Sequence, residues 1–124
     1  MLVDDEYPPS AIFLEYITGL EMITLEDYTQ QRMDKIVSGI QQIHKALVRH
    51  RDPKPKNMMV VTDTAERVVW MDFDRAETYN GHQVTSEQEE LLRVEEEIVV
   101  DIGECLALDH AKGELEEAYI FYCT

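Results

Sequence analysis

The chain has few of the features that mark secreted, membrane or nucleic-acid-binding proteins. Its two cysteines, Cys105 and Cys123, are too few for a disulfide scaffold and lack the C-x-x-C spacing of a metal site. No apolar run approaches the ~20 residues of a membrane span, and the acidic N-terminus lacks the basic and apolar parts of a signal peptide. We therefore expect a cytoplasmic protein with reduced cysteines.

Basic residues are also scarce, with 11 Lys and Arg against 26 Asp and Glu, which gives a net charge of −15. This balance argues against binding nucleic acid or an anionic membrane surface, because both require a basic face. The charge is uneven: residues 1–28 carry seven acids and no base, and residues 82–124 carry twelve acids and two bases. Residues 29–81 carry nine bases and seven acids, so this middle third is the part suited to a phosphate-bearing ligand.

What remains is enough for one globular domain, since 44% of the 124 residues are hydrophobic. Apolar residues recur every three or four positions in two segments that start with capping-box patterns at Thr24 and Ser86. These patterns predict amphipathic helices over residues 24–49 and 86–109. The residues expected to pack the helices together are Ile36, Ile40, Ile43, Leu47, Leu91, Ile98 and Ile102.

Shorter apolar runs predict β-structure. Residues 57–62 and 67–72 are rich in strand-forming side chains, and the four residues between them suit a hairpin. Residues 11–17 predict a half-buried strand. The apolar tail at 118–122 is expected to pack as a short helix or strand.

A polar loop lies between the first helix and the hairpin. Residues 50–57 read H-R-D-P-K-P-K-N, and the second hairpin strand ends at Asp72-Phe73. In this order the segments resemble the catalytic region of the protein kinase-like superfamily, in which H-R-D-x-x-x-x-N is followed by a hairpin and D-F-G. The resemblance covers about residues 10–110 and implies a Mg²⁺- and ATP-dependent phosphotransferase fold.

The resemblance assigns a role to each motif residue. Asp52 would accept the proton of the attacking hydroxyl, and Lys54 would lie near the transferred phosphate. Asn57 and Asp72 would be the metal ligands, which agrees with the preference of Mg²⁺ for oxygen ligands. We expect the side-chain oxygens of Asn57 and Asp72 to lie within roughly 4–6 Å of each other, which leaves room for one cation.

Two further segments resemble parts of the same fold. Residues 13–19 look like the hinge between the two kinase lobes, so the backbone of Glu15, Tyr16 and Ile17 would pair with adenine. Residues 100–106 look like the start of the buried helix whose aspartate holds the catalytic loop. Asp101 is therefore either that aspartate or an ordinary exposed helical acid.

The chain also departs from the protein kinase pattern. It contains no G-x-G-x-x-G sequence and no lysine before the hinge segment. Asp74 replaces the glycine of D-F-G, so residues 72–76 are closer to the I-D-[FW]-[DE]-x-A pattern of aminoglycoside and choline kinases. About ten residues separate Ala76 from the second predicted helix, too few for a regulated activation loop.

Together these features predict an α+β fold: the mostly helical C-terminal lobe of a kinase-like protein with a small β-hairpin and no N-terminal lobe, as one truncated domain over residues 1–124. We expect a degenerate, pseudokinase-like lobe that binds Mg²⁺ and ATP weakly. The alternatives are a non-catalytic interaction or scaffold protein and a minimal active phosphotransferase.

The surface that an N-terminal lobe would cover is expected to be apolar here. A homodimer, or a partner that covers this surface, would bury it, and the rival solution is the chain's own N-terminus or tail folding over it. The apolar residues concerned are Ile12, Phe13, Tyr16 and Ile17 of the hinge segment and Met58, Val60, Val68 and Trp70 of the hairpin.

Overall fold

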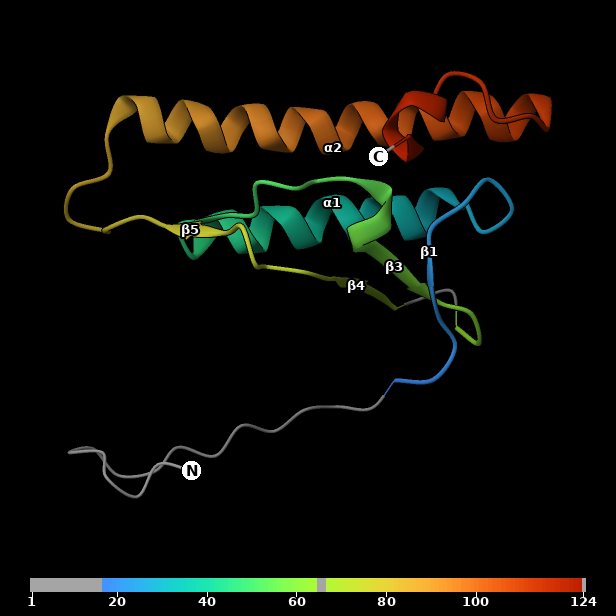
Figure 1. The fold of residues 1–124 in the computed structure, drawn as a ribbon, viewed down its shortest axis with the longest axis horizontal. Helices are drawn as coiled ribbons and strands as arrows, with labels where there is room; N and C mark the ends of the chain where they lie inside the picture. Colours follow the sequence, from blue (N-terminus) through green and yellow to red (C-terminus); the bar gives the residue numbers. More distant parts are fainter. Residues whose placement is uncertain (1–16, 65–66, 124) are drawn as a thin grey trace.

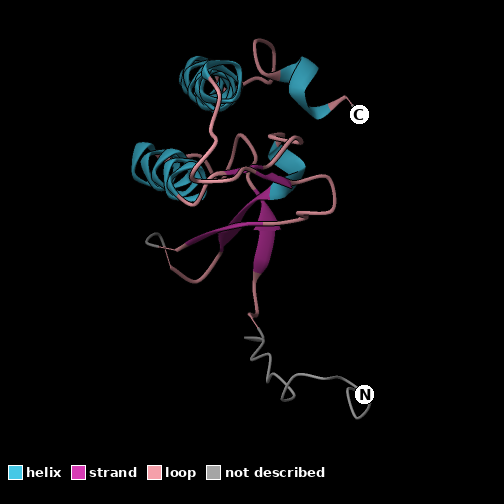
Figure 2. Cartoon of the chain, turned by 90° about the vertical axis from the view of Figure 1, so that its left-hand side faces the viewer, coloured by secondary structure: helices cyan, strands magenta, loops and turns pink. Residues whose placement is uncertain are grey.

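The computed structural model describes residues 17–64 and 67–123, and it is arranged around two long helices (Figure 1). One helix lies between the other helix and a small sheet, as the end-on view in Figure 2 shows. The described residues therefore form the α+β fold expected from the sequence. The elements follow in the order β1 (Leu20–Met22), α1 (Gln30–Lys45), β2 (Val48–Arg49), η1 (Pro55–Asn57), β3 (Met58–Val61), β4 (Val68–Trp70), β5 (Glu77–Thr78), α2 (Ser86–Lys112) and η2 (Tyr119–Tyr122).

The first helix is shorter at both ends than the sequence predicts. The Thr24 hydroxyl bonds to the Asp27 carboxylate at 3.0 Å within a turn, and the helix begins only after Thr29, whose hydroxyl accepts from the Arg32 amide at 3.0 Å. A serine or threonine with an acid three residues later also fits such a turn, so the predicted start at Thr24 was wrong. The helix ends at Lys45 because Leu47 adopts a left-handed φ of 61°.

The second helix begins where predicted and runs three residues beyond the predicted end. Thr85 is its N-cap, and a complete capping box links Thr85 with Gln88, one residue earlier than the pattern starting at Ser86. The helix stops at Gly113, whose φ of 76° is the left-handed conformation that glycine adopts readily. Its 27 residues make α2 the longest element described.

The face that α2 turns to the core differs from the prediction. Ile102 is fully buried as expected, but Ile98 is 37% exposed, and Leu91 is only partly buried. The buried face of α2 is rotated about the helix axis relative to the predicted face, so that it includes Glu95. The prediction missed this because an apolar pattern treats every glutamate as exposed. The residues of α2 that are buried are Leu92, Glu95, Val99, Ile102, Gly103, Leu106 and Asp109.

The predicted hairpin is confirmed as β3 and β4, and a third strand joins it. Met58 pairs with Trp70 and Val60 with Val68, while β1 pairs antiparallel with β3. The sequence prediction did not include β1. The strand predicted over residues 11–17 lies outside the described residues except for Ile17, which is irregular.

The two faces of this sheet are distinct. Met58 and Val60 are fully buried, and Val68 and Trp70 pack against the core. The four hairpin side chains predicted for the uncovered surface therefore face the core instead, because the alternation of the strands selects the other set. The opposite side presents Leu20, Met22, Met59, Val61, Val69 and Met71; Val61 is buried, Met71 is 40% exposed and the others are half-buried.

Two smaller features close the fold. β2 pairs antiparallel with β5, so residues predicted to end the first helix form a short strand instead. The apolar tail forms the short helix η2, in agreement with one of its two expected forms. Buried Asp109 of α2 holds the residues before η2 by accepting from the amides of residues 116, 117 and 118 at 2.8–2.9 Å.

Candidate functional site

The polar loop predicted from the sequence runs from the end of β2 into η1. Asp52 is 8% exposed and Asn57 is 3% exposed, so both motif residues are held within the structure. The Asn57 side-chain amide donates to the Asp52 backbone oxygen at 2.8 Å and to the Asp52 carboxylate at 3.1 Å. Because Asn57 follows Asp52 by five residues, its side chain can close the loop and orient the Asp52 carboxylate.

His50 joins this loop to the end of β4. Its Nε2 donates to the Met71 carbonyl at 2.8 Å, and its Nδ1 accepts from the Asp52 amide at 3.1 Å. These two partners define the tautomer with the proton on Nε2. The Met71 amide also donates to the Asn57 carbonyl at 2.9 Å, so the segments that carry Asn57 and Asp72 lie next to each other.

Glu95 of α2, which the sequence prediction missed, binds the backbone of the loop. Glu95 of α2 is 3% exposed and accepts from the backbone amides of His50 at 2.9 Å and Arg51 at 2.7 Å. His44 of α1 bonds to the same carboxylate at 2.8 Å. One carboxylate therefore connects residues 50–57, which we call the catalytic loop after the role expected from the motif, with both long helices.

Asp101, the candidate for this supporting role, is exposed on α2 and is the ordinary helical acid of the two alternatives. The role belongs to Glu95, six residues earlier. The signal in the sequence was its position: Glu95 lies between Leu92 and Val99 at three- and four-residue spacing, which places it on the apolar face.

The pKa of Glu95 reflects these contacts. Burial raises the pKa of this carboxyl, but the hydrogen bonds from His44 and from the two loop amides outweigh burial and lower it below its usual value. Glu95 is therefore ionised at neutral pH, which makes its bonds to the loop charge-assisted and stronger than neutral ones.

Asp52 is also held as a carboxylate. Burial raises its pKa, while the Asn57 hydrogen bond and the charge of Lys56 lower it, and the balance lies below the usual value. Lys56 forms the ion pair with Asp52 at 3.4 Å. Lys54, predicted from the motif to lie near the transferred phosphate, is half-buried two residues from Asp52, and its charge also lowers the pKa of Asp52.

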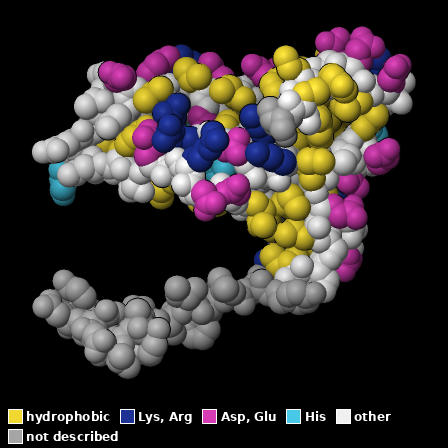
Figure 3. Space-filling model, in the orientation of Figure 1, with side chains coloured by type: hydrophobic (Ala, Val, Ile, Leu, Met, Phe, Trp, Pro, Cys, Tyr) yellow, Lys and Arg dark blue, Asp and Glu magenta, His cyan; other side chains and the backbone are white. Residues whose placement is uncertain are grey.

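Further arginine side chains lie around the loop, and Figure 3 shows Lys and Arg side chains gathered over the middle of this face. Arg49 contacts the Glu77 carboxylate at 3.3 Å, and Arg51 lies 3.8 Å from it. The Tyr79 hydroxyl donates to Glu77 at 2.8 Å. This last bond is the main cause that lowers the pKa of Glu77. Glu77 of β5 is therefore an anion that lies between Arg49 of β2 and Arg51 of the loop.

The two residues predicted to bind magnesium lie at the end of η1 and shortly after β4. Asn57 uses its amide nitrogen on Asp52, so its side-chain oxygen is the atom that remains to bind a cation. Asp72 is exposed at the end of β4, where a left-handed φ of 57° turns the chain and its carboxylate accepts from the Asp74 amide at 3.2 Å. Two oxygen donors are enough for Mg²⁺, which keeps several waters and takes its other ligands from phosphates.

Other ligand sites are weaker. No cluster of three or more histidine, cysteine or acidic side chains suited to a metal occurs in residues 17–64 and 67–123. Of the predicted adenine-binding residues, Glu15 and Tyr16 lie outside the described part of the chain, and Ile17 is half-buried before β1. The catalytic loop and the end of β4 are thus the parts of the predicted site that the described structure brings together.

Such a loop, closed by its own asparagine and followed by a hairpin ending in Asp-Phe, is typical of the protein kinase fold. The protein kinase domain family matches residues 4–95 of the chain. The chain belongs to this family and represents part of a kinase domain.

Curated relatives support the assignment. The chain is 37% identical over 81 residues to skeletal/cardiac muscle myosin light chain kinase 2 of Rattus norvegicus and of Homo sapiens, which covers 58% of this chain and 13% and 14% of theirs. It is 31% identical over 81 residues to myosin light chain kinase 3 of Danio rerio, covering 58% of this chain and 11% of that protein. No solved structure matches the chain. Within the described residues, neither long helix is both long and apolar enough to cross a membrane.

Proposed function

We propose that this chain is a kinase-type catalytic lobe that binds Mg²⁺ and ATP weakly and, by itself, does not transfer the phosphoryl group. The observation that carries the proposal is the closed loop network, in which Asn57 orients the Asp52 carboxylate and Glu95 holds the loop backbone. A network of buried polar groups that is fully bonded keeps a site in one geometry.

Each residue has a defined task in this proposal. Asp52 would accept a proton from the substrate hydroxyl, for which its ionised state at neutral pH is suitable. Asn57 and Asp72 would hold Mg²⁺, which neutralises charge on the nucleotide phosphates when bound. Lys54 would face the transferred group.

We expect no turnover by this chain alone, because its sequence lacks other groups that position the phosphates. The 124 residues contain no glycine-rich G-x-G-x-x-G loop, and no lysine precedes residue 35. Phosphoryl transfer depends almost entirely on positioning and electrostatic stabilisation. The lobe therefore keeps the base and the metal ligands but lacks the groups that would cover and orient the phosphates.

Thermal unfolding with and without Mg²⁺ and ATP tests this function. We expect the two together, at millimolar concentration, to raise the melting temperature by about 2 °C or more, since only binding to the folded state can do so. Asp72→Asn should abolish the shift, whereas Asp101→Asn, which changes an exposed aspartate of α2, should retain it. No shift for the wild-type chain, or an equal shift for Asp72→Asn, would refute nucleotide binding at this site.

Self-association is a second function favoured by a specific observation. The side of the sheet that faces away from the core presents the half-buried apolar residues named above together with Met71, which is 40% exposed. Apolar strands with an open side favour association between chains. We propose a homodimer through this face, with a partner that covers it as the alternative.

Light scattering over a tenfold concentration range tests the dimer. A mass near twice 14.4 kDa that returns to the monomer value in Met59→Lys and Val69→Lys would support it, because a charge on the interface costs desolvation. Leu108→Lys is the matched control, since Leu108 is 59% exposed on α2. A monomer of wild-type chain at all concentrations would refute self-association without affecting the nucleotide proposal.

A further inference from the structure

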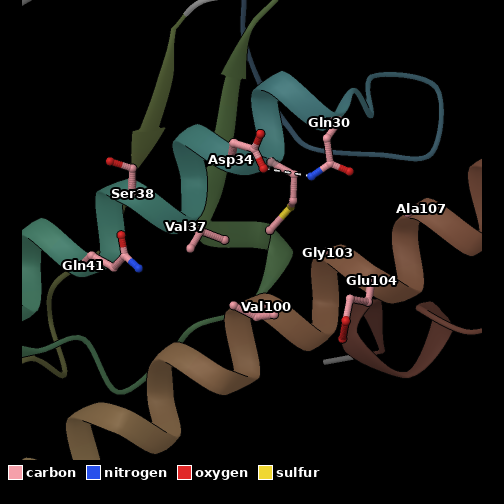
Figure 4. A pocket seen from close by; sticks show the side chains of 10 residues that line it. Gln30, Asp34, Val37, Ser38, Gln41, Val100, Gly103, Glu104 and Ala107 are labelled. Atoms are coloured by element: carbon pink, nitrogen blue, oxygen red, sulfur yellow. Dashed lines mark hydrogen bonds between the residues drawn. The ribbon is translucent and has the colours of Figure 1, made fainter.

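A groove runs between the two long helices and contains none of the catalytic-loop residues. It contains a cavity of ≈ 310 Å³ between α1 and α2, shown in Figure 4. A second hollow of ≈ 450 Å³ is lined by α2 alone and adjoins the first at Val100, which lines both. Along α1 the cavity extends from Gln30 to Gln41, about three helical turns or roughly 18 Å.

The floor of the groove is apolar. Val37 of α1 lies opposite Val100 of α2 (Figure 4), and Met33 and Ala107 also line the cavity. The helices approach closely at Gly103, where a Cβ atom would lie 2.7 Å from Met33 Cγ. Val100 remains 37% exposed, although it is a large aliphatic side chain in the middle of the groove. This floor leaves apolar surface in water that an apolar side chain of a ligand would cover.

The rim of the groove is acidic. Asp34, which accepts from Gln30 at 2.8 Å, lines α1, and Glu104 lines α2. The second hollow adds Glu96, Glu97 and Asp101. Among the described lining residues the one cation is Arg93, which already forms ion pairs with Glu90 and Glu97. The groove therefore has an excess of negative charge on both sides of an apolar floor.

We propose that this groove binds a basic amphipathic helix of a partner protein. The apolar side of such a helix would cover Met33, Val37 and Val100, and its Lys and Arg side chains would face the rim acids. The length of the groove along α1, from Gln30 to Gln41, fits about three turns of a helix. A second copy of this chain is a poor occupant, because its α2 carries nine acids against two bases, and like charges would meet.

The proposal is tested with a defined probe. An 18-residue peptide of leucine and lysine, patterned so that leucine occupies one helical face, is titrated into the full chain by calorimetry at 0.15 M salt. We expect the double variant Asp34→Asn with Glu104→Gln to weaken binding at least tenfold, because it removes one charge from each side of the groove. Val100→Gln, which keeps the charge and removes apolar surface, is expected to weaken it several-fold.

The matched control removes the same charge elsewhere. Asp63→Asn with Glu114→Gln also removes two exposed acids, from the hairpin connection and the C-terminal turn, and should change the affinity less than twofold. Circular dichroism and melting curves confirm that all variants fold. An equal loss in the control, equal binding of a scrambled Leu/Lys peptide, no binding at all, or self-association that Val100→Gln abolishes would each overturn the proposal.

Discussion

Glu95 is the side chain on which the geometry of the catalytic loop depends most directly. Replacing it with glutamine removes the charge and places an N–H group opposite one of the two loop amides that the carboxylate now accepts from. We expect Glu95→Gln to lower the free energy of unfolding by about 2–4 kcal/mol. Urea unfolding measures this loss.

The neighbouring residue provides the control for this change. Glu96→Gln alters the same chemical group one position along α2, where the carboxylate makes an exposed hydrogen bond to Gln41. Its effect should stay below about 0.5 kcal/mol. Equal effects of the two substitutions would show that Glu95 is not the support of the loop.

Two buried carboxylates predict how stability depends on pH. Burial raises the pKa of Asp109, but three backbone amides outweigh it and lower the pKa below its usual value, and the pKa of Glu95 is lowered as well. A carboxyl with a lowered folded pKa contributes stability above its unfolded pKa and loses it as the pH falls through its folded pKa. The melting temperature should therefore fall below about pH 4.5, where unfolded carboxyls begin to bind protons.

Asp109→Asn separates this effect from general acid unfolding. The variant should be less stable than wild type at pH 7, and the difference should shrink as the pH falls toward 2, because both proteins then carry an uncharged group at this position. The measurement is a melting curve at each pH. A difference that stays constant from pH 7 to pH 2 would contradict the assigned role of the carboxylate.

Gly39 predicts an unusual effect of alanine in a helix. An added Cβ would lie 2.8 and 2.9 Å from Trp70 ring atoms, and the Trp70 indole is fixed by its hydrogen bond to the Ile36 carbonyl at 3.0 Å. We expect Gly39→Ala to destabilise by about 1–3 kcal/mol, although alanine has the higher helix propensity. Ser38→Ala at the adjacent exposed position should be nearly neutral, and stabilisation by Gly39→Ala would show that the indole does not pack there.

At this scale the sequence predicted some contacts and missed others for a clear reason. The sequence predicted a polar loop at residues 50–57, but it did not predict that the Asn57 side chain closes this loop on Asp52. It did not predict Glu95, because a glutamate that opens a run of three, Glu95 to Glu97, is typical of a solvated helix face. Its role depends on partners 44 and 45 residues away, which no local pattern contains.

The two helices show the same limit for whole elements. Three-four periodicity predicted both of them, because that spacing is a property of the segment itself. The ends of α1 depend on finer features: a side-chain turn at Thr24 replaces the first turns, and the left-handed Leu47 ends the helix. Strand β2 forms by pairing with β5. Its residues continue the three-four pattern of the helix, so the sequence of this segment alone does not indicate a strand.

Two isoleucines test the face assigned to each helix. Ile40 on α1 is fully buried, whereas Ile98 on α2 is 37% exposed, although the sequence predicted both in the core. Ile40→Ala should cost about 2–5 kcal/mol through lost burial and the cavity left behind. Ile98→Ala should cost about 1 kcal/mol or less. Chemical denaturation of the pair measures the difference, and similar losses would mean that the face of α2 is assigned wrongly.

For the whole molecule, contacts distant in sequence complete the fold. The Tyr122 hydroxyl donates to the Ile23 carbonyl at 2.8 Å, and Asp109 holds the residues that lead to η2. The tail thus joins the end of α2 to the segment after β1. The sequence predicted that this apolar tail packs as a short helix or strand, but not where it packs, because its partner lies 99 residues earlier.

The carboxylate of Glu95 also determines how fast the catalytic loop exchanges its hydrogens with water. Backbone amides of surface loops usually exchange their hydrogens with water quickly, because such loops open easily. The amides of His50 and Arg51 instead donate to Glu95 of α2. They can exchange only when the loop leaves α2, and His44 ties the same carboxylate to α1. We expect these two amides to be protected from hydrogen exchange nearly as well as the amides of the helical core. The loop of residues 50–57 would then unfold together with the two helices as one cooperative unit.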